Sequence, residues 1–418
     1  MSALSGARVL VVGASGCIGS RLVERLVLEC GAHVRALVRR PMTSHPIARF
    51  PIEVIVGDVL DSHAVNASAE GCSVVFYCAR DRGRDPVYQR AVDVDGPGHI
   101  VDAARLTGAR VVHVSTMRVY DRPVHGVFDE CTPPLPKGQH PSSNAKLEGE
   151  QLALARGAQY GVPVVVMQPG IVYGPNAHYT LEMLSDLQTG RVVLVNGGVG
   201  ICNVVYVDDA VTALLLAATN HRADGERFLI SGPEHPTWAQ FVGAFEAMLG
   251  VHRTVSLSER DALRLWQRSA RSRSLIHHAF RVIQSAPRLR ERLLATRATT
   301  PARWIATRVL PDSLVDALRT ALSTRDRSET DDELPIRLVE PWVVKNRARE
   351  ARVSIDKANR ILGYTPVFTL SHGMDLTKQW ARSAGLIPHG PPEPVCTART
   401  HDQAVADARS HCLEMMRR

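Results

Sequence analysis

A glycine-rich turn near residue 13 has the spacing of a phosphate-binding loop. Gly13, Gly16 and Gly19 follow a short apolar run at residues 8–12 and lead into a helical pattern at residues 20–29. In such a unit the first glycine permits a tight turn, the second lets backbone N–H groups approach a pyrophosphate, and the third packs the helix on the strand. The helix N-terminus favours the anionic charge. These residues predict a dinucleotide site, which a glycine repeat in an isolated loop would not.

The end of the next strand pattern indicates which dinucleotide is bound. Residues 31–38 end in Val38, where NAD-binding folds place a carboxylate for the ribose 2′-OH, and Arg39 and Arg40 follow. A guanidinium can bind a 2′-phosphate through two hydrogen bonds. The sequence therefore favours NADP(H) over NAD(H). The alternative is that both arginines are solvated where a strand ends.

Further strand patterns alternate with helical patterns along the chain. They occupy residues 51–58, 73–79, 109–116, 162–168 and 227–230. Strands separated by helices predict an α/β, Rossmann-type doubly wound parallel sheet that binds ligands at the carboxyl ends of its strands. We expect Asp58, which ends the pattern at residues 51–58, to accept a hydrogen bond from an adenine amino group.

Composition limits the class of protein. The 418 residues are 45% hydrophobic and 22% charged, which is typical of a soluble globular chain with a substantial core. We find neither a basic-then-apolar leader nor an apolar run of bilayer length, so we expect a cytoplasmic protein without a transmembrane segment. The eight cysteines show no CxxC pair and no clustered Cys/His spacing, so no disulfide framework and no metal site are expected.

The net charge of +8 is concentrated in one part of the chain, because residues 253–352 are dense in arginine. Such a segment could face nucleic acid, an anionic membrane or an acidic substrate, or it could be a solvated helix surface, which we favour. No signature of an RNA-recognition, zinc-finger or helix-turn-helix module is present, so nucleic acid is not an expected partner.

Several segments together resemble the extended short-chain dehydrogenase/reductases, the NAD-dependent epimerase/dehydratase group. Besides the glycine turn, they are residues 57–59, 94–96, 103–104, 113–120, 168–175, 205–210, 356–358 and 362–366. The similarity extends to about Trp380. It implies an enzyme with a small-molecule substrate, in which Thr116 occupies the active-site Ser/Thr position and Lys146 the lysine position.

The turn and the resemblance together imply a set of cofactor-binding residues. They are Gly13, Ser15, Gly16, Cys17, Ile18, Gly19, Arg39, Arg40, Asp58, Val59, Ala79, Lys146, Pro169, Ile171 and Val172.

One position departs from the pattern that the resemblance implies. The family has a tyrosine four residues before the lysine, where it serves as general acid or base, and this chain has Ser142. A serine hydroxyl is a far weaker acid than a phenol and lies on a shorter side chain. Other proton sources are then His140, Lys146, Tyr120, Tyr173, or a water held by Ser142 and Thr116. We therefore take Thr116, Ser142, Lys146 and Tyr173 as the candidate catalytic residues.

Three functions remain open at this stage. The first, which we favour, is an NADP(H)-dependent oxidoreductase or redox isomerase that acts on a carbonyl or hydroxyl of a sizeable apolar molecule, in specialised metabolism. The second is a non-redox lyase, cyclase or isomerase with a retained nucleotide, and the third is an NADP(H)-sensing binding protein. Sugar-nucleotide 4,6-dehydratases carry Asp-Glu directly after the threonine, where Met117 and Arg118 stand, so that subclass is not expected.

The expected domain organisation follows the family. Residues 1–175, joined again by residues 204–232, form the NADP(H)-binding domain, and residues 176–203 and 233–385 form the substrate-binding domain. A helical expansion at residues 255–335 could be a lid, a dimer surface or a membrane-touching face, or it could serve packing alone. We favour a lid or a widened pocket. Residues 386–418 read as a proline-rich linker and tail. A homodimer is a further expectation.

Overall fold

The computed structural model describes residues 3–81, 83, 85–269 and 334–387. The chain divides into two compact units, residues 1–377 and residues 378–418, and the sheet and the cavity described below belong to the first. None of the helices within the described residues combines the length and apolar character needed to cross a bilayer.

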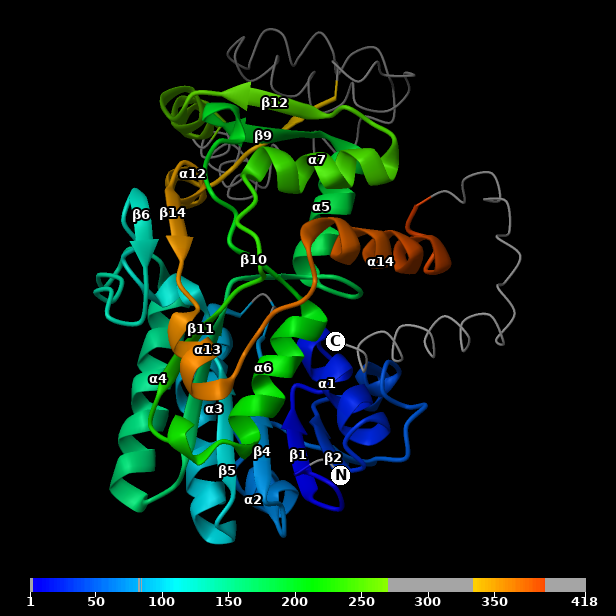
Figure 1. Cartoon of the computed structure of the whole chain (residues 1–418), viewed down its shortest axis with the longest axis vertical. Coiled ribbons are helices and arrows are strands. Elements are labelled where there is room, and N and C mark those ends of the chain that lie inside the picture. Colours follow the sequence, from blue (N-terminus) through cyan, green and yellow to red (C-terminus); the bar gives the residue numbers. More distant parts are fainter. Residues whose placement is uncertain (1–2, 82, 84, 270–333, 388–418) are drawn as a thin grey trace, which may run out of the picture. The chain divides into compact units, whose positions relative to one another are not determined.

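A seven-stranded parallel sheet forms the centre of the first unit (Figure 1). Its order is β11-β7-β5-β4-β1-β2-β3, and each neighbouring pair is parallel. The strands are β1 (Arg8–Val12), β2 (His33–Val38), β3 (Glu53–Val56), β4 (Val74–Tyr77), β5 (Arg110–Val114), β7 (Val164–Pro169) and β11 (Arg227–Ile230). This confirms the predicted Rossmann-type fold, and the seven strands are those whose apolar patterns predicted them.

Helices cover both faces of this sheet. Helices α1 (Cys17–Leu28) and α6 (Val207–Thr219) pack on one face, where Leu22 and Leu214 meet Val9 and Val11 of β1. Helices α2 (Ser62–Ala69), α3 (Pro86–Thr107) and α4 (Pro141–Tyr160) pack on the other, against Leu10 and Val12. Successive side chains of a strand point to opposite faces, so an unbroken apolar strand serves two buried cores.

Shorter elements lie beyond the carboxyl ends of the sheet strands (Figure 1). Strand β9 lies between β12 and β13, β6 pairs with β14, and β8 pairs with β10. Their bounds are β6 (His125–Phe128), β8 (Ile171–Tyr173), β9 (Arg191–Val195), β10 (Val204–Tyr206), β12 (Thr254–Leu257), β13 (Ile336–Arg337) and β14 (Glu350–Val353). The helices here are α5 (His178–Thr189), α7 (Trp238–Leu249) and α12 (Pro341–Arg347). Helix α13 (Asp356–Leu362) packs instead beside α6 and β11, and α14 (Leu370–Ser383) follows it in the chain.

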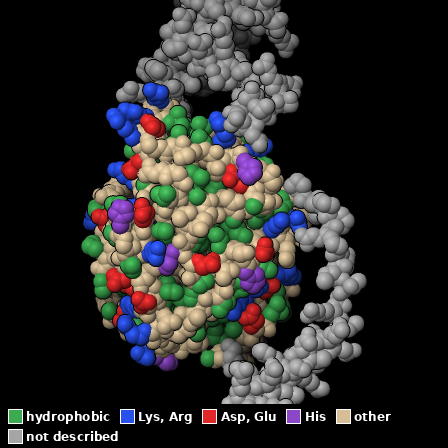
Figure 2. Space-filling view, turned by 45° about the horizontal axis from the view of Figure 1, so that its top comes forward, with side chains coloured by type: hydrophobic (Ala, Val, Ile, Leu, Met, Phe, Trp, Pro, Cys, Tyr) green, Lys and Arg blue, Asp and Glu red, His purple; other side chains and the backbone are tan. Residues whose placement is uncertain are grey.

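The predicted helical expansion lies largely outside the described residues. At its start, Thr254–Leu257 is strand β12 and residues 259–269 are helical; after residues 270–333, Ile336–Arg337 is strand β13. The predicted tail at residues 386–418 is described only at residues 386–387. On the face drawn in Figure 2, basic and acidic side chains are interspersed and do not form a patch of one sign.

Candidate functional site

The carboxyl ends of the sheet strands open into a cavity of about 1280 Å³. It contains the glycine turn, the Arg39-Arg40 pair, Thr116, Ser142 and Lys146 among its lining residues. The fold therefore brings together most of the residues that the sequence predicted. Three of the predicted residues do not line this cavity: Asp58, Tyr120 and Tyr173.

The glycine turn is shaped by close backbone packing. Gly13 has φ +82°, and a Cβ at this position would lie 2.7 Å from the backbone of Ala79. A Cβ on Gly19 would lie 2.2 Å from the carbonyl oxygen of Gly13. Gly16 precedes α1 as its N-cap and offers no side-chain cap. The first turn of α1 therefore presents its backbone N–H groups at the cavity wall, an arrangement that fits a pyrophosphate.

Arg39 is held at the end of β2 by two neighbours. Its Nη2 lies 2.7 Å from Oδ1 of the buried Asp81, and its guanidinium lies 5.3 Å from the ring centroid of Tyr88. The Tyr88 hydroxyl in turn donates a hydrogen bond to Asp58 Oδ2 at 2.6 Å. Asp58 thus lies behind Tyr88 and supports the Arg39 region.

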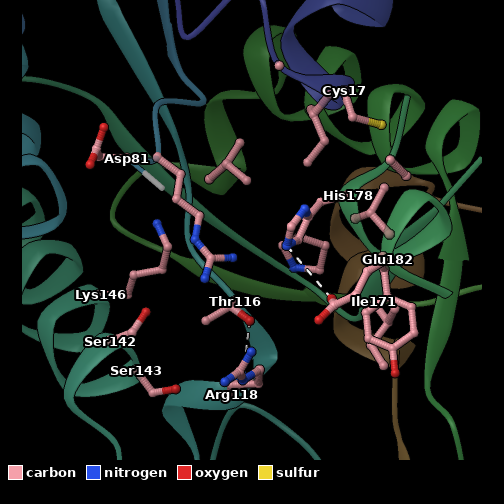
Figure 3. Close-up of a pocket in the computed structure, with 18 of the residues that line it drawn as sticks. Cys17, Asp81, Thr116, Arg118, Ser142, Ser143, Lys146, Ile171, His178 and Glu182 are labelled. Atoms are coloured by element: carbon pink, nitrogen blue, oxygen red, sulfur yellow. Dashed lines mark hydrogen bonds and ion pairs between the residues drawn. The ribbon is translucent and has the colours of Figure 1, made fainter. Parts of the chain in front are cut away.

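Helix α4 presents Ser142 and Lys146 to the cavity. His140 is the N-cap and accepts a hydrogen bond from the backbone N–H of Ser143, and Pro141 occupies the first turn. Residues four positions apart lie on one helix face, so Ser142 and Lys146 point the same way. Thr116 follows β5, and Figure 3 shows its side chain facing the same part of the cavity.

Lys146 forms a buried ion pair that the sequence analysis did not predict. Its Nζ lies 3.0 Å from Oδ1 of Asp93 in α3, with side-chain exposures of 9% and 6%. The two helices approach closely because a Cβ on Gly149 would lie 1.9 Å from the carbonyl oxygen of Asp93. Only glycine allows this contact, which brings Asp93 within reach of Lys146.

The other predicted proton sources are placed less favourably. The Tyr120 hydroxyl donates a hydrogen bond to the buried Gln168 at 2.7 Å, and the Tyr173 hydroxyl donates one to the carbonyl oxygen of Thr369 at 3.4 Å. Burial raises the pKa of both phenols. Tyr173 is also packed against Gly373, away from the cavity. Tyr173, expected from the sequence as a candidate catalytic residue, therefore does not face the cavity: its ring packs with those of Tyr206 and Phe241.

His140 does line the cavity, but as a neutral imidazole. Burial lowers its pKa to about 4, and the charges of Arg118 and Arg80 add to this effect. At neutral pH it therefore holds one proton on the ring, and its Nδ1 lies 2.9 Å from Ser143 Oγ.

Comparison with known proteins identifies the family. The sequence pattern of the NAD dependent epimerase/dehydratase family matches residues 9–231. The chain belongs to this family. Within it, the chain is 27% identical over 391 residues to a 4-hydroxy-2-methyl-3-oxo-4-farnesyl-3,4-dihydroquinoline-1-oxide ketoreductase of Stigmatella aurantiaca, covering 91% of this chain and 99% of the relative.

Two further similarities span most of the chain. A 3 beta-hydroxysteroid dehydrogenase/Delta 5-->4-isomerase of Mycobacterium tuberculosis is 24% identical over 384 residues and 88% of either chain. The solved structure of epimerase Mth375 from Methanothermobacter thermautotrophicus superimposes with a TM-score of 0.65 at 19% identity, covering 92% of this chain and 95% of that one. The second similarity supports the fold alone.

Three residues that line the cavity, and the buried Asp93 that pairs with Lys146, were not predicted from the sequence. Arg118 was noted only because it excluded a subclass, and nothing singled out Asp93, Arg122 or Trp342. Asp93 directly precedes residues 94–96, one of the segments that carry the family resemblance, and a charged residue in that place could have suggested a role at the site. Trp342 and Arg118 are more than 200 positions apart, so no local sequence pattern could predict their contact.

Proposed function

We propose that this protein is an NADP(H)-dependent oxidoreductase or redox isomerase that acts on a carbonyl or hydroxyl group of a sizeable, largely apolar molecule. One observation carries the proposal: a single cavity contains the glycine turn together with Thr116, Ser142 and Lys146. A dinucleotide bound along the turn would lie in the same space as these side chains.

The chain's own residues have separate roles in this proposal. The nicotinamide, when bound, supplies or accepts the hydride. Thr116 holds the substrate oxygen through its hydroxyl and Ser142 provides a second hydrogen bond, while Lys146 holds the nicotinamide ribose. Ser142 stands where we infer that relatives have a tyrosine, so it acts as a hydrogen-bonding partner and not as the acid. A water held between Ser142 and Thr116 then carries the proton.

The preference for NADP(H) rests on the end of β2. Arg39 and Arg40 line the cavity there, directly after the apolar Val38. A 2′-phosphate would meet the Arg39 guanidinium, whose orientation is already fixed by Asp81 and Tyr88. Binding a 2′-phosphate would therefore cost the Arg39 side chain little conformational entropy.

The size and polarity of the substrate follow from the far side of the cavity. Its lining there includes Met183, Ile201, Trp238, Val339 and Trp342. These side chains suit a large apolar body, with only a few polar groups to orient it. The two relatives that span most of the chain are named for a farnesyl quinoline oxide and a steroid, which are molecules of this kind.

The first test is to denature the purified protein and identify any released nucleotide by mass spectrometry. Bound NADP⁺ or NADPH supports the proposal, as does an empty site that binds added NADPH and consumes it with a bulky ketone. Turnover without net change in the nicotinamide would favour the non-redox alternative, and nucleotide binding without turnover would favour a sensor. If no nucleotide binds, the proposal is wrong.

A further inference from the structure

We propose that the substrate carries an oxyanion, in the simplest case a carboxylate, which Arg118 and Arg122 bind beside the reacting oxygen. This inference rests on the proposed function, because Thr116 marks the place of that oxygen. It adds a class to the substrate: an apolar body with one anionic group.

Arg118 lies next to the reacting position. It stands two residues after Thr116, and its backbone N–H donates a hydrogen bond to Thr116 Oγ1 at 3.3 Å. Figure 3 shows its side chain beside Thr116 in the cavity. An anion bound by this guanidinium would therefore lie close to the oxygen that Thr116 holds.

The ring of Trp342 positions the Arg118 guanidinium. It lies 4.1 Å from the ring centroid of Trp342, and its Nη2 is 3.2 Å from His140 Nε2. Its Nε is buried and has no hydrogen-bond partner among the described residues. Stacking on an aromatic face orients a guanidinium and leaves its edge available for planar oxygen pairs.

Arg122 supplies a second buried cation. It is 9% exposed and lines the same cavity, where it donates a hydrogen bond to Asn346 Oδ1. Burial lowers the pKa of both Arg118 and Arg122 to about 10, and like charges nearby add to the effect. Both remain charged at neutral pH, so the site holds positive charge at a cost in solvation.

No carboxylate within the described part of the chain forms an ion pair with Arg118 or Arg122. Glu340 also lines the cavity, and its charge acts on Arg118 without forming an ion pair. Three other lining carboxylates pair with different cations. These pairs are Asp81 with Arg39 at 2.7 Å, Asp186 with Arg337 at 3.6 Å and Glu182 with His178 at 3.7 Å. Buried charges are normally paired, so a ligand anion is the partner that this site lacks.

The anion belongs to the substrate and not to the dinucleotide. Trp342 and Asn346, which contact the two arginines, come from α12, far along the chain from the glycine turn. The glycine turn and Arg39, which also line the cavity, already offer binding groups for the phosphates of the dinucleotide. A substrate oxyanion between Arg118 and Arg122 would fix its orientation through charge-assisted hydrogen bonds.

A matched pair of probes tests this inference without turnover. Calorimetric titrations of the full-length protein, saturated with NADP⁺, would compare 4-phenylbutyrate with 4-phenylbutyramide. In the second probe an NH₂ group replaces one carboxylate oxygen, so the charge is lost while the shape is kept. We expect the carboxylate to bind about 10-fold or more tightly. In Arg118→Met and Arg122→Met this preference should fall to within about 3-fold, whereas Arg118→Lys should keep part of it.

Arg49→Met is the control, because it removes one charge at an exposed position paired with Glu24 and should leave the preference unchanged. Any of four results would overturn the inference. They are equal affinity for the two probes, a preference that survives in both Met variants, competition of phenylbutyrate with NADP⁺, and no binding at about 10 mM. If NADP⁺ itself does not bind, the proposed function fails, and the same titrations without nucleotide still decide the anion site.

Discussion

Lys146 Nζ lies 3.0 Å from Asp93 Oδ1, and both side chains are almost wholly buried between α3 and α4. The lysine therefore enters the cavity wall already paired with a carboxylate. The pair fixes the lysine's position and reduces the positive charge that it presents. Both effects suit a lysine that holds a ribose, and neither favours one that donates a proton.

Breaking this ion pair should destabilise the fold. We expect Asp93→Asn to lower the free energy of unfolding by about 3 kcal/mol, because it leaves the Lys146 ammonium buried without its counter-charge. Urea denaturation measures the change. Combining Asp93→Leu with Lys146→Met should cost less than the sum of the two single variants. Glu148→Gln, which removes the exposed partner of Arg90, should cost less than about 1 kcal/mol. A small effect of Asp93→Asn would mean that the pair is not formed in solution.

Arg39 should distinguish the two nicotinamide dinucleotides. In Arg39→Met we expect the Kd for NADPH to rise about 10-fold or more, because one charge-assisted contact to the 2′-phosphate is lost. The Kd for NADH should change little. Fluorescence titration of both nucleotides provides the comparison, with Arg49→Met as a charge-matched control. An equal loss for NADPH and NADH would count against the 2′-phosphate assignment.

Introducing the phenol at position 142 tests the proposed role of Ser142. We expect Ser142→Tyr to raise kcat/KM for reduction of simple ketones by about 10-fold or more, since general acids commonly contribute more than this. Ser142→Phe adds similar bulk without a hydroxyl and should give no gain. The assay is NADPH oxidation followed at fixed pH. If Ser142→Tyr binds nucleotide but gains nothing over Ser142→Phe, the phenol is not the missing group.

His113 should contribute to the loss of stability in acid. Burial, together with the charge of Lys146, lowers its pKa to about 3 from an ordinary value of 6.5, and neither ring nitrogen has a hydrogen-bond partner among the described residues. Between these values the unfolded chain binds a proton that the folded protein does not. The free energy of unfolding is therefore unaffected by this titration above pH 6.5, and it decreases as the pH falls from 6.5 toward 3.

The variant His113→Phe removes that titration. Relative to wild type, its free energy of unfolding should improve by up to about 1.4 kcal/mol for each pH unit below 6.5. Above pH 7 the difference between the two proteins should stay constant. Urea denaturation at a series of pH values measures both ranges, and parallel curves for the two proteins in acid would contradict the prediction.

The sequence alone determined the sheet and the nucleotide end of the cavity. Unbroken apolar runs such as residues 9–12 are strands buried on both faces. The glycine turn is a local motif whose spacing requires a strand before it and a helix after it. The candidate roles of Thr116, Ser142 and Lys146 came from resemblance, and only the fold shows that the three share one cavity.

Only the tertiary structure decided the partners of those residues. Lys146 meets Asp93 because two helices cross at a glycine, and Arg118 meets Trp342 because α12 returns to the cavity from the far end of the chain. Tyr173 was predicted at the site and is directed into apolar packing, because the neighbouring aromatic rings determine which way it points. Periodicity records which face of an element is buried, but it carries no information about what that face meets.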